Sequence, residues 1–179
     1  DLEEFESCTR PKIYKQMLFG ITFFHAVARE RAKFGPLGWN IPYVFSAADL
    51  RITLMQLLVF CNDTDKYKSL PFDTMMYLYG ECNYGGRVTD DKDRRALNAV
   101  LQDFCRPECL GKGYKYSPSG TYYAPSEGPM QTYLDYVEGL PMDEAPELFG
   151  LHDNADITKK VNETRVLLDT MLSLQPKTS

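Results

Sequence analysis

The chain has 179 residues, of which 44% are hydrophobic and 25% charged, and its net charge is −5. These proportions are typical of a globular domain and exclude a chain that is disordered throughout. The acidic balance argues against a dedicated nucleic-acid binder, which would show a basic face. The most apolar run, residues 17–27, is shorter than the ~20 residues needed to cross a bilayer. We therefore expect no nucleic-acid partner and no membrane partner.

The first residues, Asp1 to Phe5, are acidic and do not resemble a signal peptide. Because the sequence also does not begin with methionine, we expect a piece of a longer chain. Its five cysteines are scattered, which is typical of reduced thiols rather than of a disulfide framework: Cys8, Cys61, Cys82, Cys105 and Cys109.

Apolar residues at helical spacing predict an all-α fold. The predicted helices cover residues 9–33, 46–61, 72–79, 90–104, 130–138 and 156–174, with a turn or two at 143–149. The first four would form a compact bundle over residues 9–105. The segment 106–128 is rich in Pro, Gly, Ser and Tyr and is long for a loop, so its tyrosines are expected to lie against something.

Local signals set the ends of these helices. Thr9 is the expected N-cap of the first, Ser46 and Asp49 resemble a capping box, Gly80 is expected to end the third, and Thr89 or Asp90 would cap the fourth. The second helix would bury Leu50, Leu54, Leu57, Leu58 and Cys61, and the fourth Leu97, Val100, Leu101 and Phe104. The last helix carries one apolar face: Ile157, Val161, Leu168 and Met171.

The glycine-rich run 84–87 has two interpretations. Its backbone amides and Arg87, ahead of a helix, could hold a phosphate. However, the chain contains neither a G-x-x-x-x-G-K-[ST] nor a G-x-G-x-x-G motif. We favour a tight turn in which glycine is needed for a positive φ.

Other possible sites have simpler explanations. The charged run 90–95 could bind magnesium, but acidic residues also suit the first turn of a helix. The cysteines lack the paired short spacings of a zinc site. His25 is more typical of a buried core histidine than of a catalytic base, and nothing nearby in the sequence suggests a nucleophile for His152.

The aromatic loop 34–43 also has two interpretations, which the residues alone leave open. Trp39 and Tyr43 could anchor a docking surface, or the loop could fold its aromatic side chains onto its own bundle.

Several segments, spread in order over nearly the whole chain, closely resemble dynein heavy chains. They are FFHAV (23–27), FGPLGWNIPY (34–43), GECNYGGRVTDD (80–91), DRR (93–95), YSPSGTYYAP (116–125), FGLH (149–152) and NADIT (154–158). Pro42 and Cys82 resemble axonemal more than cytoplasmic members. Lys92 stands where many members have tryptophan, which removes an aromatic contact.

The resemblance implies a place in the ring of the motor. Residues 9–105 would be the helical lid, or small subdomain, of the sixth AAA+ module. Residues 106–179 would be an extended connector and the truncated start of the C-terminal domain. The implied location is the cytoplasm and cytoskeleton, in the axoneme of a cilium or flagellum.

The implied function is a structural, mechanical and non-catalytic part of an ATP-driven, minus-end-directed microtubule motor. Mg-ATP would bind in other modules, so no cofactor, metal or catalytic residue is expected here. The implied partners are neighbouring AAA+ subdomains and the C-terminal domain of the same heavy chain. Microtubules and the dynein intermediate and light chains would be reached only through the parent chain.

The candidate interface or structural residues come from the two resembling loops and the helix start after them: Trp39, Asn40, Tyr43, Tyr84, Gly85, Gly86, Arg87, Asp90, Asp91, Arg94 and Arg95. Arg87 could be the relic of an arginine that contacts a nucleotide phosphate, or part of an ion pair at an interface, which we favour. Two other functions remain as alternatives: a stand-alone helical adaptor that binds proteins, and an enzyme or nucleotide-binding module.

Overall fold

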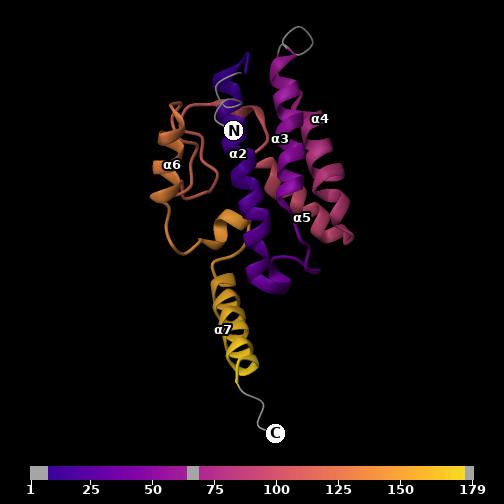
Figure 1. The fold of residues 1–179 in the computed structure, drawn as a ribbon, viewed down its shortest axis with the longest axis vertical. Helices are drawn as coiled ribbons and strands as arrows, with labels where there is room; N and C mark the ends of the chain where they lie inside the picture. The colour runs from indigo at the N-terminus through magenta and orange to yellow at the C-terminus, as the bar shows by residue number, and fades with distance from the viewer. Residues whose placement is uncertain (1–7, 64–68, 176–179) are drawn as a thin grey trace.

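The computed structural model describes residues 8–63 and 69–175, and there it confirms the predicted all-α class (Figure 1). The helices are α2 (Pro11–Glu30), α3 (Ala47–Asn62), α4 (Phe72–Tyr77), α5 (Asp91–Gln102), α6 (Met130–Glu138) and α7 (Ala155–Ser173). Short 3-10 or π-helical turns lie between them: η1 (Arg31–Leu37), η2 (Leu78–Asn83), η3 (Gly85–Arg87), η4 (Pro107–Leu110) and η5 (Pro146–Phe149). The predictions for 1–7, 64–68 and 176–179 lie outside the described residues.

Helix α2 is the centre of the molecule. It packs against α3 and α5, while η4 and η5 also contact it (Figure 1). Its buried side chains include Tyr14, Met17, Ile21, Phe24 and Ala28. The predicted N-cap is wrong, because the Thr9 hydroxyl accepts no hydrogen bond from the first turn of α2 and instead donates to the carbonyl oxygen of Cys61 at 3.3 Å. Thr9 therefore ties the start of α2 to the end of α3.

Helix α3 begins at the predicted capping box, which is confirmed by the bond from the backbone N–H of Ser46 to Asp49 Oδ2 at 2.7 Å. The predicted buried stripe is partly wrong, because three leucines are only half-buried: Leu50, Leu54 and Leu58. Thr53 and Phe60 join Leu57 and Cys61 in the core instead. Thr53 can be buried because its hydroxyl donates to the carbonyl oxygen of Asp49 at 2.8 Å.

The predicted end of the third helix at Gly80 is wrong, because α4 continues directly into the π-helical turn η2. The reason lies in packing. A Cβ added to Gly80 would be 2.0 Å from Asn98 Oδ1 on α5, so the glycine allows two helices to approach closely. Wide turns of this kind are often found at functional sites.

Of the two predicted caps of helix α5, Thr89 and Asp90, the structure has Asp90, and the predicted core side is confirmed. Asp90 Oδ1 accepts from the backbone N–H groups of Lys92 and Asp93 at 2.9 and 3.0 Å. The predicted core side is buried: Leu97, Val100, Leu101 and Phe104.

The segment after α5 covers the side of α2 away from α3 (Figure 1). Tyr116 and Tyr122 are buried, which confirms that this tyrosine-rich segment lies against the bundle. The ring of Tyr116 lies 4.8 Å from that of Phe104, between centroids, and 5.6 Å from that of Phe23. Within the described ranges, the β pairing is one isolated bridge, Lys115 with Tyr123.

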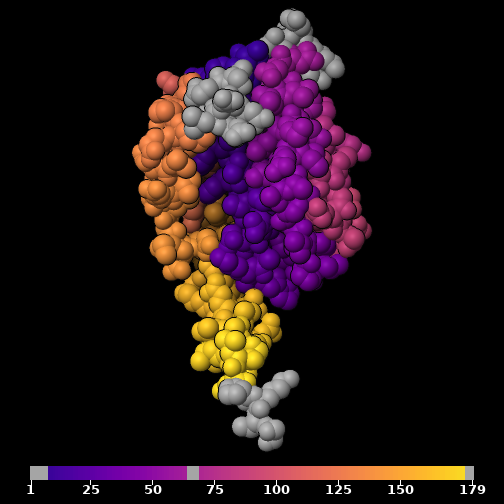
Figure 2. Space-filling view, in the orientation of Figure 1, coloured from indigo at the N-terminus to yellow at the C-terminus, as the bar shows by residue number. Residues whose placement is uncertain are grey.

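Helix α7 extends beyond the rest of the molecule (Figures 1 and 2). Its four predicted apolar-face residues are all more than half exposed: Ile157, Val161, Leu168 and Met171. The five cysteines are free thiols. No helix in the described ranges has both the length and the apolar character that a membrane span requires.

Candidate functional site

The candidate residues gather where the loop after α2 meets η2, η3 and the start of α5. We call this region, residues 34–49 and 80–98, the junction. Gly35 has a φ of 57°, a left-handed conformation that favours glycine. Gly38 lies so close to η1 that an added Cβ would be 1.8 Å from the carbonyl oxygen of Arg31. These two glycines let the loop turn back onto the bundle.

Trp39 anchors this loop to its own bundle. The side chain is 4% exposed, its Nε1 donates to the carbonyl oxygen of Ala28 at 3.0 Å, and the Arg31 guanidinium lies 5.0 Å from its ring centroid. The rings of Tyr43 and Phe45 lie 6.1 and 5.9 Å away. Of the two interpretations of residues 34–43, this burial favours packing on the bundle for the indole.

Two carboxylates at the start of α5 hold the loop. Asp90, besides capping the helix, accepts from Asn40 Nδ2 at 3.2 Å, and its backbone N–H donates to the Tyr43 hydroxyl at 3.2 Å. Hydrogen bonds from the backbone of Asp93 and from Asn40 lower the pKa of Asp90. The buried Asp93 accepts from the backbone N–H groups of Asn40 and Ile41 at 3.0 and 3.2 Å. Loop and helix are therefore joined through four polar contacts.

Arg87 makes an ion pair inside the chain. Its Nε lies 2.7 Å from Asp49 Oδ2, and its Nη2 donates to Ser46 Oγ at 3.4 Å. Burial alone would raise the pKa of Asp49, but the hydrogen bonds from Arg87 and Ser46 outweigh it and lower that pKa. The pair therefore fixes η3 to the first turn of α3, while the Arg87 side chain stays 45% exposed.

The glycines beside Arg87 have a different role from the predicted one. Neither Gly85 nor Gly86 has a positive φ, so the predicted conformational reason is wrong. A Cβ on Gly85 would lie 1.9 Å from the carbonyl oxygen of Gly80, so the need there is for close approach. A Cβ on Gly86 would meet nothing within 4 Å.

Tyr84 closes the junction against α2. Its side chain is fully buried, and its hydroxyl lies 2.9 Å from His25 Nδ1. Burial, and to a lesser extent the charge of Arg29, lowers the pKa of His25. Burial also raises the pKa of Tyr84. The pair is a neutral hydrogen bond inside the core, as expected for a structural histidine.

The arginines of α5 differ. Arg94 donates to Glu81 Oε2 at 3.0 Å and to the carbonyl oxygen of Val88 at 2.9 Å, which ties α5 to η2 and η3. Asp91 and Arg95 are exposed on the same helix. The candidate set is thus divided between side chains that hold the junction together and side chains that face solvent.

The sequence-based set omitted four residues that the junction depends on: Arg31, Asp49, Glu81 and Asp93. A local signal existed for two of them, since Asp49 stands at the predicted capping box and Asp93 three residues after a cap. Arg31 and Glu81 had none, because their partners are set by packing.

The carboxylates of the junction bind backbone N–H groups of the chain itself. The Asp90 carboxylate caps the N-terminus of α5 and accepts from the backbone N–H groups that an anion at a helix N-terminus would use. Arg87 is paired with Asp49. Within residues 8–63 and 69–175, no three His, Cys, Asp or Glu side chains are grouped as a metal ion would require. His152 Nδ1 accepts from the backbone N–H of Asn154 at 3.2 Å, in an exposed turn.

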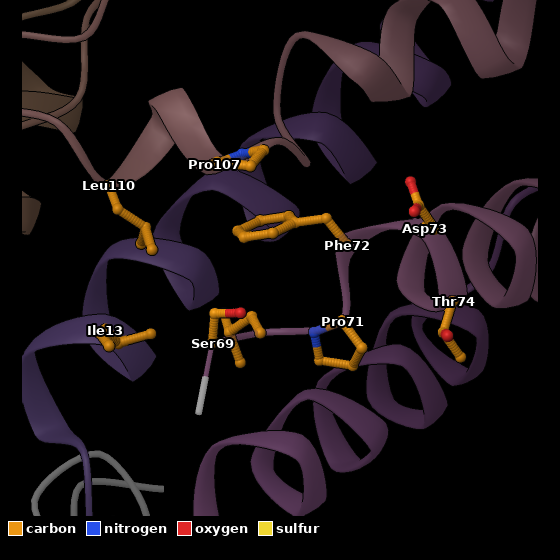
Figure 3. A pocket seen from close by; sticks show the side chains of 9 residues that line it. Ile13, Ser69, Pro71, Phe72, Asp73, Thr74, Pro107 and Leu110 are labelled. Carbon is orange, nitrogen blue, oxygen red and sulfur yellow. The ribbon is translucent and has the colours of Figure 1, made fainter. Parts of the chain in front are cut away.

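A separate groove of about 640 Å³ lies between the start of α2, residues 69–74 and η4 (Figure 3). Its walls are mainly apolar, with the Phe72 ring lying across it between Pro71 and Pro107. None of the candidate residues lines it.

Comparison with known proteins identifies the family. A sequence profile described as the dynein heavy chain AAA lid domain matches residues 14–155. The chain is 52% identical over 175 residues to dynein axonemal heavy chain 3 of Homo sapiens. The aligned segment covers 98% of this chain and 4% of that protein. The chain is 48% identical over 177 residues to dynein axonemal heavy chain 12 of Mus musculus, covering 98% of this chain and 6% of that protein.

A third relative, dynein axonemal heavy chain 1 of Homo sapiens, is 48% identical over 174 residues, 97% of this chain and 4% of its own length. The chain therefore spans only a small part of these relatives. The profile crosses residue 105 without a break, and one buried core includes side chains from both sides of that position. On these grounds the chain belongs to the dynein heavy chain family and corresponds to its AAA lid domain.

Proposed function

We propose that this chain is a non-catalytic, mechanical segment of the ring of a dynein motor. The observation that carries the proposal is that the charged groups holding the junction together are paired with groups of the same chain. Two features could hold a nucleotide phosphate: the glycine-rich turn with Arg87, and the start of α5. Arg87 is paired with Asp49, and Asp90 caps the start of α5. A segment built in this way transmits movement as a rigid body more readily than it binds Mg-ATP.

Mg-ATP then belongs to other modules of the parent chain, and residues 9–105 serve as the lid of the sixth module. Residues 106–179 lead from it toward the C-terminal domain. The proposed division at 105/106 separates two regions of the sequence rather than two separately packed domains, because side chains from both regions contribute to one core.

The partners of this segment would be neighbouring AAA+ subdomains and the C-terminal domain of the same heavy chain. Apolar side chains exposed on α3 fit that role, at spacings that place them on one stripe: Ile52, Met55 and Val59. Contacts with microtubules, intermediate chains and light chains would be made elsewhere in the parent chain. The axonemal relatives support a place in the axoneme of a cilium or flagellum.

The stand-alone adaptor is less favoured, because matches to dynein heavy chains cover 97–98% of the chain. It would gain support only if the natural protein were short.

Calorimetric titration of the purified chain with Mg-ATP tests the non-catalytic proposal. We expect no binding tighter than a Kd of about 100 µM, and no release of phosphate. The variant Arg87→Ala provides the matched comparison, since it frees Asp49 and removes the phosphate-binding candidate. Saturable binding that Arg87→Ala abolishes would contradict the proposal and restore the nucleotide-binding alternative.

A further inference from the structure

Among the residues that the structure describes, helix α7 contacts the bundle near its first turns. Ala155 and Lys159 are its buried residues, and the helix packs mainly against η1. Residues 163–174 are all exposed. The helix therefore projects from one end of the molecule, the lower end in Figure 1.

A carboxylate links α7 to η1 at this end of the molecule. Glu144, in the segment before η5, pairs through Oε2 with Lys159 Nζ of α7 and through Oε1 with Lys33 Nζ of η1, at 3.3 Å for the second pair. The side chain of Lys159 is 5% exposed and that of Glu144 is 26% exposed. Burial alone would raise the pKa of Glu144, but the hydrogen bond from Lys159, a backbone hydrogen bond and the charges of Lys159 and Lys33 together outweigh it and lower that pKa. Glu144 is thus charged and bound to both elements.

Lys159 lies against aromatic side chains that join η1 and η5. The Lys159 ammonium lies 5.9 Å from the centroid of the Phe34 ring, which packs against Phe149 at 4.9 Å between ring centroids. Arg31 donates to the carbonyl oxygen of Phe149. Farther along α7, Asn162 Nδ2 donates to the carbonyl oxygen of Lys33 at 3.4 Å. Lys159 and Asn162 of α7 therefore both contact η1, and η1 packs on η5 through Phe34 and Phe149.

A buried lysine must be paired, since an ammonium left without its carboxylate is strongly disfavoured away from water. If Glu144 lost its charge, Lys159 would have to move toward solvent. The rest of α7 offers little to resist that movement, because its residues beyond 162 are exposed. Gly150, with a φ of 66°, begins the short connection from η5 to α7 and can take up a change of direction.

We propose that Glu144 is a clasp: by joining Lys33 and Lys159 it sets the direction in which α7 leaves the bundle, and its loss lets α7 swing while the bundle stays folded. The inference does not depend on the proposed function. It assigns a conformational role to residues outside the junction, and it means that the apolar residues on α7 are presented in one direction only while the clasp is closed.

A distance measurement between two spin labels tests the clasp. Cys82 is exposed on the bundle and provides one label, whereas the other four cysteines are buried. The substitution Ser173→Cys provides the second label at the exposed end of α7. Double electron–electron resonance then compares the labelled parent with Glu144→Gln. The matched control is Lys160→Gln, which removes the exposed ion pair between Lys160 and Asp156 on the same helix.

We expect one narrow distance distribution for the parent and for Lys160→Gln, and a roughly twofold broader or displaced distribution for Glu144→Gln. Lys33→Met removes one arm of the clasp and should give an intermediate width. The far-UV circular dichroism of Glu144→Gln should remain that of a folded bundle. An unchanged distribution in folded Glu144→Gln, equal broadening in Lys160→Gln, or loss of the bundle fold in Glu144→Gln would each overturn the proposal.

Discussion

The junction and helix α7 differ in how far their side chains are paired within the chain. In the junction, charged groups such as Asp90 and Asp93 bind backbone N–H groups of the chain itself, and Trp39 is 4% exposed. In α7, Lys159 is held by one carboxylate, and residues 163–174 are exposed. A region that carries candidate functional residues can therefore be paired largely within its own chain. In contrast, the apolar side chains of α7 are exposed among the described residues.

The largest expected effect is in the junction, at Gly85. Gly85→Ala would place a methyl group 1.9 Å from the carbonyl oxygen of Gly80, so backbone must move. We expect the free energy of unfolding to fall by about 3 kcal/mol, measured by urea denaturation. Gly86→Ala is the matched control, because its Cβ meets nothing within 4 Å, and it should change stability by no more than about 0.5 kcal/mol. Equal effects would contradict the close-approach explanation.

The next effect concerns the buried carboxylate of Asp93. Asp93→Ala removes the acceptor for the backbone N–H groups of Asn40 and Ile41. We expect a loss of about 2 kcal/mol in the free energy of unfolding, by chemical denaturation monitored through Trp39 fluorescence. Arg95→Ala, an exposed change on the same helix, should cost no more than about 0.5 kcal/mol. The account of the junction fails if the two variants are equally stable.

A smaller effect should appear with pH. The pKa of His25 is lowered by burial and then by Arg29, so the folded protein binds this proton less tightly than the unfolded chain. The stability from neutral His25 is present above its ordinary pKa of 6.5 and is lost as pH falls below it. We expect a slope no steeper than about 1.4 kcal/mol per pH unit between about pH 7 and pH 5.

Urea denaturation across that range measures the slope, and His25→Gln should flatten it. Asp49 and Glu144 have lowered pKa values, so the stability that their charged forms contribute is lost only below that pH range. A slope that His25→Gln leaves unchanged would mean that another group dominates.

The smallest effect is expected in α7. A chain that ends after Asn162 loses only exposed residues of the described helix. Its free energy of unfolding should stay within about 0.5 kcal/mol of the full chain, as measured by thermal and urea denaturation. A larger loss would show that the end of α7 supports the bundle, which would remove the contrast between the two regions.

Local chemistry was enough to predict much of the fold. The capping box at Ser46 and Asp49, the cap at Asp90 and the helix 130–138 depend on neighbours within a few residues, and all three are confirmed. Thr9 and Gly80 were predicted wrongly from equally local signals. Their roles are set by Cys61 and Asn98, which are distant in the sequence and come close only through packing.

The candidate site was predicted less completely for the same reason. The resembling segments pointed to the correct loops, but not to the partners that join them, such as Asp93 with Ile41 or Arg87 with Asp49. The clasp is a stronger case. Glu144 lies 111 residues from Lys33 along the chain, so no spacing pattern could have indicated the contact.

Amide hydrogen exchange on the intact chain, followed residue by residue by nuclear magnetic resonance, tests the central contrast most directly. The account predicts that amides of α5 exchange only when the whole bundle unfolds. Those of residues 163–173 should exchange at least about 100-fold faster, through local opening of α7. Equal protection of the two helices would contradict the account, because α7 would then belong to the same cooperative core as the junction.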